Sequence, residues 1–449
     1  MAMPAPMPLL LGGPDGADAW TLESYLQAGG YQAARKALAM PRDQATNSVP
    51  GLIEAVKLSG LRGRGGAGFL AGLKWSLVDY RASKPRYLAV NCDESEPGTF
   101  KDRDIVARRP HLLLEGILIA CHACGIEHAY VYIRGEYAAE FARLAEACAQ
   151  AYRAGCLGRN VLGSGHSFHV TPHRGAGAYI CGEESALLSS LEGDRGYPRI
   201  KPPYPAVEGA WRCPTVVNNA GTLALLPSIL GIGPEAWSRI GPPKSAGPMV
   251  YCLSGHVKKP GLYELPMTVT LRQLIYECGG GVLDDLPLKA VIPGGSSMPV
   301  LKFNGPYVGS DGVQRTDSLD LGMDFESVRA AASMLGSAGV IVMHARTCMV
   351  RALHNLVRFY AHESCGQCTP CREGTGWLEK ILERILLGRG RPADVQTLLS
   401  LARQMSGTTI CLLSDSCSMP VGSFVLKFRE EFEHYCAHGK SMVEDAVAL

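Results

Sequence analysis

Three cysteines at every third position restrict most strongly what this chain can fold into. Within ESCGQCTPCREGTGW, two residues separate Cys365 from Cys368 and Cys368 from Cys371. In a straight helix of about 3.6 residues per turn, such positions drift across about a third of the circumference, so an undistorted helix cannot point all three sulfurs at one centre. Gly366 and Pro370 permit a loop that wraps a bound group instead. Closely spaced thiolates in such a loop are typical of iron–sulfur clusters.

A single [4Fe–4S] cluster needs a fourth ligand from elsewhere in the chain. Cys411 in TTICLLSD and Cys417 in SDSCSMP both lie downstream, and their spacing does not distinguish them. Zinc is the competing metal, but zinc knuckles consist of paired C-x2-4-C or Cys/His ligands rather than three cysteines in one short loop. Buried free thiols are the remaining alternative, and they are our interpretation of Cys121 and Cys124 in the apolar run ILIACHAC. For the cysteine loop we predict a [4Fe–4S] site.

Composition excludes several functional classes. The chain has 449 residues, a formal net charge of +2 and 16 cysteines. The small charge does not fit a nucleic-acid-binding protein. The first residues, MAMPAPMPLLLGG, contain no Lys or Arg and do not resemble a signal peptide, and the longest apolar runs are too short for a spanning helix. We therefore expect a soluble protein of a reducing compartment, whose cysteines are thiols or metal ligands.

The pattern of apolar residues divides the chain into four regions. Residues 1–60 are predicted to be mainly helical. In 61–240 short apolar strands alternate with helices, which favours an α/β layer with a mainly parallel sheet. Strands with one helix and many glycines predict a small α+β module at 245–330. Residues 334–449 begin with one strand and are otherwise predicted to be helical around the cysteine loop.

A glycine-rich loop, LRGRGGAGFLAGLKW, spans residues 61–75. Gly63, Gly65 and Gly68 satisfy G-x-G-x-x-G, but this pattern alone is weak because the preceding segment is predicted to be a helix and turn rather than a strand. Its neighbours favour nucleotide phosphate binding over a merely flexible loop, because they supply cations, backbone amides that can approach an anion, and a stacking face. These neighbours are Arg62, Arg64, Lys74, Gly65, Gly66 and Phe69.

An acidic segment, VNCDESEPGTFKDRD, follows the predicted strand that contains Val90. Its polar side chains, Asn91, Asp93, Glu94 and Glu96, should lie at a carboxyl end of the sheet, where open α/β folds bind ligands. Carboxylates repel phosphate but accept hydrogen bonds from ribose hydroxyls or a flavin ring N–H. A carboxylate on the adenosine ribose would also favour NADH over NADPH. A solvated acidic turn is the alternative.

A second glycine-rich loop, HRGAGAYICGEESALLSSLEG, leads into a predicted helix that begins near Glu183 and Glu184. The free N–H groups of a helix start suit an anion or a polarised ring carbonyl. Downstream segments supply further side chains that bind rings and hydroxyls: Lys201 and Tyr204 in PRIKPPYP, and Asn218, Asn219 and Thr222 in PTVVNNAGTLA.

Taken together, RGRGGAGF, NCDESEPGTFKDRD, GAGAYICGEES, PTVVNN and ESCGQCTPCREGTGW, in this order, resemble the NADH-oxidising flavoprotein subunit of respiratory complex I. The similarity extends from about residue 18 to residue 436. It implies an α/β Rossmann-like FMN-binding domain, a β-grasp (SLBB-like) module and a C-terminal helical bundle with a [4Fe–4S] cluster. The family places its fourth cluster ligand in T-I-C-x-L-x-D, which selects Cys411.

The resemblance also implies which residues contact the nucleotides. FMN contacts are implied for Gly63, Arg64, Gly65, Lys74, Asn91, Asp93, Glu94, Tyr179, Gly182, Glu183, Asn218 and Asn219. NAD(H) contacts are implied for Gly66, Phe69, Glu96, Glu184, Lys201 and Tyr204, and Ala67 and Gly68 complete the cofactor-binding glycine loop. The chain departs from the family pattern at Leu77, where an aromatic residue is usual, at Tyr204 in place of Phe, and at Ala220-Gly221, where a carboxylate is lost.

The implied activity is hydride transfer from NADH to FMN, followed by single-electron transfer to the [4Fe–4S] cluster and on towards quinone. No catalytic side chain is required, because FMN carries the chemistry. The expected partners are a [2Fe–2S] thioredoxin-like subunit and a larger iron–sulfur subunit. We expect a cytoplasmic location, peripheral to the inner membrane through these partners and without direct membrane insertion. The alternatives are a diaphorase subunit of a hydrogenase or formate dehydrogenase, and a non-enzymatic zinc-binding scaffold.

Overall fold

The first half of the molecule is built around parallel strands. Among residues 3–443, which the computed structural model describes, β1 (Tyr87–Cys92), β2 (His128–Ile133), β3 (His169–Arg174) and β4 (Thr215–Asn219) form a parallel sheet in the order β3-β2-β1-β4. The chain passes from β1 outward through β2 and β3, and then returns to pair β4 with the other edge of β1. The strand order therefore reverses between β1 and β4, and open α/β sheets bind ligands beyond the carboxyl ends of the strands at such a point.

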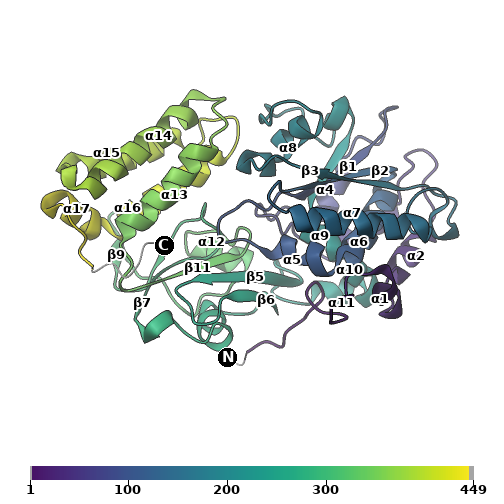
Figure 1. Ribbon diagram of the computed structural model, residues 1–449, viewed down its shortest axis with the longest axis horizontal. Coiled ribbons are helices and arrows are strands. Elements are labelled where there is room, and N and C mark those ends of the chain that lie inside the picture. Colours follow the sequence, from purple (N-terminus) through teal and green to yellow (C-terminus); the bar gives the residue numbers. More distant parts are fainter. Residues whose placement is uncertain (1–2, 444–449) are drawn as a thin grey trace.

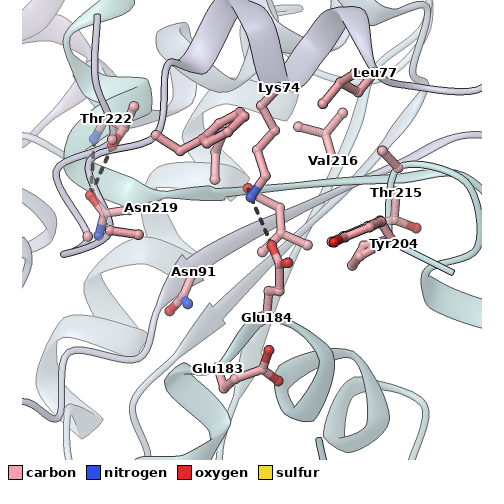
Figure 2. A pocket seen from close by; sticks show the side chains of 18 of the residues that line it. Lys74, Leu77, Asn91, Glu183, Glu184, Tyr204, Thr215, Val216, Asn219 and Thr222 are labelled. Atoms are coloured by element: carbon pink, nitrogen blue, oxygen red, sulfur yellow. Dashed lines mark hydrogen bonds and ion pairs between the residues drawn. The ribbon is translucent and has the colours of Figure 1, made fainter. Parts of the chain in front are cut away.

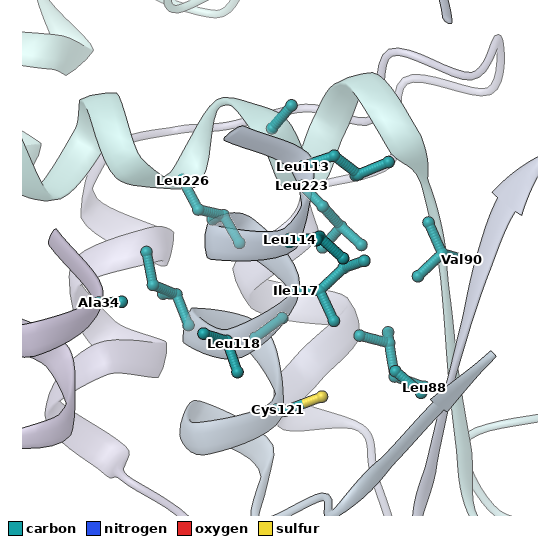
Figure 3. Packing of buried hydrophobic residues seen from close by; sticks show 14 of the residues in the cluster. Ala34, Leu88, Val90, Leu113, Leu114, Ile117, Leu118, Cys121, Leu223 and Leu226 are labelled. Atoms are coloured by element: carbon teal, nitrogen blue, oxygen red, sulfur yellow. The ribbon is translucent and has the colours of Figure 1, made fainter. Parts of the chain in front are cut away.

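Helices cover this sheet, and α6 (Pro110–Cys124) is buried along its whole length. It is apolar around its circumference, as expected for a helix enclosed by protein. Figure 3 shows Leu113 and Ile117 of α6 together with Leu88 and Val90 of β1, and all four belong to one hydrophobic core.

The remaining helices of the α/β part are shorter or lie nearer the surface. They are α4 (Ala71–Ser76), α5 (Lys101–Arg108), α7 (Ala138–Arg153), α8 (Glu184–Leu191), α9 (Ala220–Ala224), α10 (Leu226–Ile232) and α11 (Pro234–Ser238), with short helical turns η1 (Val161–Gly163), η2 (Tyr179–Gly182) and η3 (Ala210–Arg212). The predicted burial of Cys121 and Cys124 is confirmed, because both thiols are free and enclosed within α6.

The N-terminal helices α1 (Leu22–Gln27), α2 (Gln32–Leu38) and α3 (Pro50–Leu58) pack into the same hydrophobic core as the sheet. Glu115 of α6 fastens them: its carboxylate accepts hydrogen bonds from the backbone N–H groups of Tyr31 and Ala34, each at 2.8 Å, and from the Tyr25 hydroxyl. The regions 1–60 and 61–240 therefore share one core.

A second sheet follows, in the order β6-β5-β11-β7-β8 within the described chain. Its strands are β5 (Pro248–Gly255), β6 (Gly261–Pro266), β7 (Leu288–Ile292), β8 (Leu301–Lys302) and β11 (Gly339–His344), accompanied by η4 (Gln273–Cys278), η5 (Leu283–Asp285), the hairpin β9 (Tyr307–Val308) and β10 (Gln314–Arg315), and α12 (Phe325–Ala330). The segment LRQLIYECGG, expected to be an α-helix, contains the π-helical turn η4. β11 pairs in parallel with β5 and antiparallel with β7, so it lies in the middle of this sheet although it follows the other strands in sequence.

The C-terminal region is a helical bundle with its own core. Its elements are α13 (Met349–Glu363), α14 (Thr369–Arg384), η6 (Ile385–Arg389), α15 (Pro392–Met405), α16 (Leu413–Lys427) and α17 (Arg429–His438). In Figure 1 the bundle stands beside the α/β part, and the second sheet lies below both. None of the helices within residues 3–443 is long and apolar enough to cross a membrane.

Candidate functional site

A cavity of about 750 Å³ lies where the strand order reverses. This volume falls within the range of roughly 300–1,000 Å³ that is usual for ligand pockets. The cavity is lined by Gly63, Gly65, Ala67, Gly68, Phe69, Lys74, Leu77, Asn91, Gly182, Glu183, Glu184, Lys201, Tyr204, Pro205, Ala206, Val207, Thr215, Val216, Val217, Asn218, Asn219 and Thr222. Asn91 ends β1 and the asparagine pair ends β4, so the predicted position at the carboxyl edge of the sheet is confirmed for these residues.

The glycine loop between α3 and α4 forms one wall of the cavity. Its backbone comes so close to the end of β4 that a Cβ atom at Gly65 would lie 3.0 Å from the Cβ of Asn219. The N–H of Arg64 donates to the hydroxyl of Thr222 at 2.8 Å, which holds the loop in place. Gly66 has a φ of 127°, a conformation that other residues rarely adopt. The glycines are therefore required by close approach and by backbone conformation.

Ion pairs cross the polar side of the cavity. Lys74 Nζ lies 2.8 Å from Glu184 Oε2, and Lys201 Nζ lies 2.8 Å from Glu184 Oε1 and 2.9 Å from Glu183 Oε1. Figure 2 shows Lys74 extending from α4 across the cavity to Glu184 on α8. Burial raises the pKa of Glu184, but the two ammonium groups outweigh burial and hold it below its usual value. The lysines that line the cavity are thus neutralised by glutamates and are available to an anion only by exchange of partners.

The helix start predicted to offer free N–H groups is already capped. Glu183 is the N-cap of α8, and its carboxylate accepts hydrogen bonds from the N–H groups of Ser185 and Ala186 at 2.8 and 2.9 Å. Such self-capping is common where an acidic residue precedes a helix. A ligand at this wall would therefore meet Glu183 itself rather than free helix donors.

Asp93 presents a buried carboxylate beside the cavity. Its Oδ2 has no hydrogen-bond partner among the described residues, and a Cβ atom at the neighbouring Gly182 would lie 3.8 Å from it. Burial raises the pKa of Asp93 to about 7. A buried oxygen without a partner is costly, so this atom fits a ligand that donates an N–H or O–H group.

Several of the predicted contact residues do not line the cavity: Arg64, Gly66, Asp93, Glu94, Glu96 and Tyr179. The Arg64 guanidinium is buried and donates to the carbonyl oxygens of Arg62 and Ala246 at 3.0 and 2.8 Å. The Glu94 carboxylate accepts from the N–H groups of Asp102 and Arg103 at the start of α5.

Glu96 and Tyr179 bond to each other just outside the cavity. The Tyr179 hydroxyl donates to Glu96 at 2.7 Å, and Glu96 also accepts from the N–H of Ser297 at 2.7 Å. Glu96 thereby connects the α/β part to the second sheet's neighbouring loop.

Sequence reasoning missed the apolar part of the lining. Pro205, Ala206 and Val207 follow PRIKPPYP, and Thr215, Val216 and Val217 belong to β4. Small apolar residues carry no chemical signature, although the position of β4 beside the asparagine pair could have indicated its strand residues. Leu77, expected from the family pattern to be aromatic, lines the cavity and is exposed at its mouth. Gly221, where the family carboxylate is lost, lies against Asp102, whose Oδ1 would be 2.8 Å from an added Cβ atom.

The predicted cluster cysteines converge on one apolar neighbourhood. Cys365, Cys368, Cys371 and Cys411 pack together with Ile180, Cys181 and Leu413. Burial raises the pKa of Cys411 to about 12, and the nearby Cys365 and Cys371 contribute to the rise. Cys417 is completely buried, whereas Cys411 is partly exposed beside the other thiols.

The cysteine loop is shorter than expected. α14 begins at Thr369 with Cys368 as its N-cap, so Pro370 occupies the first turn of a helix and Cys371 lies on that helix. Proline is favoured at this position because its missing N–H would be unpaired anyway. Gly366 supplies the turn, with a φ of 79°.

Four thiols fit an iron–sulfur cluster by their chemistry. Within residues 3–443, no group of three or more His, Cys, Asp or Glu side chains is gathered closely enough to hold a single metal ion.

Comparison with known proteins gives matches over nearly the whole chain. Residues 56–228 match the family model of the Nuo51 FMN-binding domain, 250–301 match the SLBB domain, and 351–435 match the NADH-ubiquinone oxidoreductase-F iron-sulfur binding region.

Relatives of known name are similar over most of their length. The chain is 50% identical to the second F-type subunit of the NADH-quinone oxidoreductase of Rhizobium meliloti over 426 residues, covering 95% of this chain and 96% of the relative. It is 48% identical to the F-type subunit of the NADH-quinone oxidoreductase of Streptomyces coelicolor, covering 93% and 88%. Among solved structures, an air-oxidised NAD+-reducing [NiFe]-hydrogenase superposes with a TM-score of 0.78 at 33% identity, covering 97% of this chain and 68% of that chain. The chain therefore belongs to the family of F-type subunits of NADH-quinone oxidoreductases.

Proposed function

We propose that this chain is the NADH-oxidising, electron-input subunit of an NADH-quinone oxidoreductase. The observation that carries the proposal is that one short segment borders both predicted cofactor sites. Gly182, Glu183 and Glu184 line the cavity, while Ile180 and Cys181 pack in the same apolar cluster as Cys371. A protein that takes a hydride and delivers single electrons needs its two redox groups this close together.

The cavity residues fit FMN. Lys74 and the amides of the glycine loop suit its phosphate, and the Asp93 oxygen without a partner suits a ring N–H. FMN, when bound, accepts the hydride of NADH and releases electrons one at a time. The asparagines at the ends of β1 and β4 (Asn91, Asn218, Asn219) supply further polar groups for orientation.

NADH would occupy the outer part of the same cavity. Phe69 and Tyr204 line its mouth with ring side chains that are 48% and 59% exposed, and they offer stacking faces. Glu184 and Lys201 lie between them and the inner part, close enough to bond ribose hydroxyls. Glu96 would join these contacts by exchanging its bond to Tyr179 or Ser297 for one to the ligand.

Cys365, Cys368, Cys371 and Cys411 would hold the [4Fe–4S] cluster. Leu412, next to Cys411, is 72% exposed, and Trp377 of α14 is 51% exposed. These large apolar side chains support contact with an electron acceptor, and we propose the [2Fe–2S] thioredoxin-like and larger iron–sulfur subunits as partners. The protein would then work in the cytoplasm, at the membrane only through its partners.

The divisions 1–60, 61–240, 245–330 and 334–449 are proposed as functional regions. The three family models fall within the last three of them, apart from the few residues of the first model before 61. A diaphorase of a hydrogenase remains the second candidate, favoured by the hydrogenase structure. Its 33% identity is lower than the 50% identity of the quinone-reductase relative, which favours the first candidate.

An anaerobic titration of the purified holoprotein with NADH tests the proposal. We expect NADH to bleach the flavin absorbance and to produce the EPR signal of a reduced [4Fe–4S] cluster. If NADH leaves the flavin absorbance unchanged, the proposed function is wrong.

A further inference from the structure

The end of α13 contacts the segment that separates the two cofactor sites. Glu363 is the last residue of α13, and its Oε2 accepts a hydrogen bond from the backbone N–H of Tyr179 at 2.9 Å. Cys365 follows two residues later in the chain, and Tyr179 is the first residue of η2. A single side chain therefore connects the start of η2 to the start of the cysteine loop.

The segment that Glu363 holds reaches both sites. From Tyr179 the chain passes through Cys181, which lies close enough to Cys365 for the two thiols to interact electrostatically, to Gly182 in the cavity wall. The bond therefore controls the backbone that lies directly between the cavity and the cysteines.

Other contacts of Tyr179 hold its side chain rather than its backbone. The ring packs edge-on against Phe359 and Tyr360 of α13, with centroid separations of 5.1 and 6.0 Å, and its hydroxyl donates to Glu96. Glu363 is the acceptor of the main-chain N–H, so its loss would free the start of η2 while leaving the ring in place. Glu363 also lies near the cavity acid, because its charge adds to the effect of burial in raising the pKa of Asp93.

We propose that Glu363 is a positioning residue that fixes residues 179–184 against the cysteine loop and thereby sets the distance for electron transfer between the cavity and the cluster. This inference rests on the proposed function. It assigns to Glu363 no contact with substrate or cofactor. Reactions that depend on fixed geometry lose rate steeply when a supporting group allows a shift of about 1 Å, so the bond to Tyr179 should influence the internal electron transfer in particular.

Two substitutions separate position from charge. Glu363→Gln retains a side-chain oxygen that can accept the Tyr179 N–H but removes the negative charge, whereas Glu363→Ala removes both. Glu373→Ala is the matched control, because Glu373 lies two residues after Cys371 as Glu363 lies two residues before Cys365. Its side chain is 46% exposed and pairs with Arg372.

The experiment uses the holoprotein with FMN and cluster bound, mixed with NADH under anaerobic conditions. Stopped-flow absorbance follows flavin reduction by the hydride, and freeze-quench EPR follows the single electron that the oxidised cluster gains from the reduced flavin. In Glu363→Ala we expect an unchanged rate of flavin reduction and a several-fold slower reduction of the cluster. Glu363→Gln and Glu373→Ala should both resemble the wild type.

Three results would overturn the inference. Cluster reduction at the wild-type rate in Glu363→Ala would show that the bond sets no distance. Equal slowing in Glu363→Gln and Glu363→Ala would assign the effect to charge. Loss of iron or slower flavin reduction in Glu363→Ala would assign Glu363 a general structural role. Failure of the proposed function itself is recognised separately, because the wild-type flavin would then not respond to NADH.

Discussion

Lys74 is the side chain of the cavity best placed to meet an anion. It extends from α4 across the cavity, bonded to Glu184 and to the carbonyl oxygen of Val217 at 2.9 Å. A phosphate in the cavity would take over the Lys74 ammonium and release Glu184. The residue therefore links the binding of one nucleotide to the availability of a carboxylate for the other.

We expect Lys74→Met to weaken FMN binding by about 10–100-fold. A hydrogen bond to a charged group contributes about 1.5–3 kcal/mol, and about 1.4 kcal/mol corresponds to tenfold in affinity. Fluorescence titration of flavin-depleted protein with FMN measures the change. Lys57→Met is the control, since Lys57 pairs with Glu54 at the surface of α3. Equal FMN affinity in Lys74→Met and Lys57→Met would contradict the assignment.

Asp93 makes the ligand-free protein sensitive to pH. Its pKa is raised to about 7 from an ordinary value of 3.8, mainly by burial. Between these values the folded state binds more protons than the unfolded state, so the contribution of Asp93 to stability falls as pH rises from about 4 to about 7. Asp93→Asn should therefore stabilise the ligand-free protein at pH 8 by up to about 4 kcal/mol, with little difference at pH 4. Thermal unfolding across this pH range provides the measurement, and a pH-independent difference would refute the explanation.

At the site, sequence motifs predicted which backbone segments meet, but not where every side chain points. Asn91, Asn218 and Asn219 could be placed because each ends a predicted strand. Arg64 could not, because its guanidinium is held by the carbonyl oxygen of Ala246, far away in sequence. Whether a charged side chain of a glycine loop faces the ligand or the neighbouring module depends on such tertiary partners.

Among the elements, the strands and helices followed from apolar periodicity, since the buried faces repeat with the expected spacing. β1, α6 and β11 were predicted close to their observed bounds. The start of α14 was not, because Pro370 was interpreted as a loop residue although proline is equally suited to the first turn of a helix. The central position of β11 depends on pairing between distant segments, which no local pattern contains.

The N-terminal helices depend on one buried carboxylate. We expect Glu115→Ala to leave the N–H groups of Tyr31 and Ala34 without partners, each at a cost of about 1–3 kcal/mol. Amide hydrogen exchange should then accelerate in residues 25–38 and remain slow in β1. Glu146→Ala, which removes a carboxylate that is 49% exposed, should change neither region. Unchanged exchange in residues 25–38 would show that packing alone holds these helices.

At the scale of the whole molecule, a buried ion pair joins the second sheet to the helical bundle. Lys289 of β7 and Glu431 of α17 lie 2.6 Å apart, with side chains 2% and 6% exposed. Glu431 also accepts the N–H of Met349 at the start of α13. The bundle is therefore fastened to the sheet at the end opposite the cysteine loop along α13.

We expect Glu431→Ala to destabilise the protein by about 3–5 kcal/mol, because it leaves the Lys289 ammonium buried without its carboxylate. Urea unfolding followed by circular dichroism should show the loss as a lower midpoint. Glu433→Ala removes an exposed carboxylate paired with Arg429 on the same helix, and it should shift the midpoint little. Similar midpoints for the two variants would mean that the buried pair contributes no net stability.

The place of β11 has a consequence for biosynthesis. β5, β6, β7 and β8 leave the ribosome before the strand that must lie between β5 and β7 has been translated. Until residue 344 emerges, the nascent chain carries two incomplete half-sheets with unpaired inner edges, and such edges invite aggregation. Synthesis of this module therefore passes through a vulnerable interval that ends only when the last strand is inserted, and a truncated transcript that stops before β11 would yield a product that chaperones must hold.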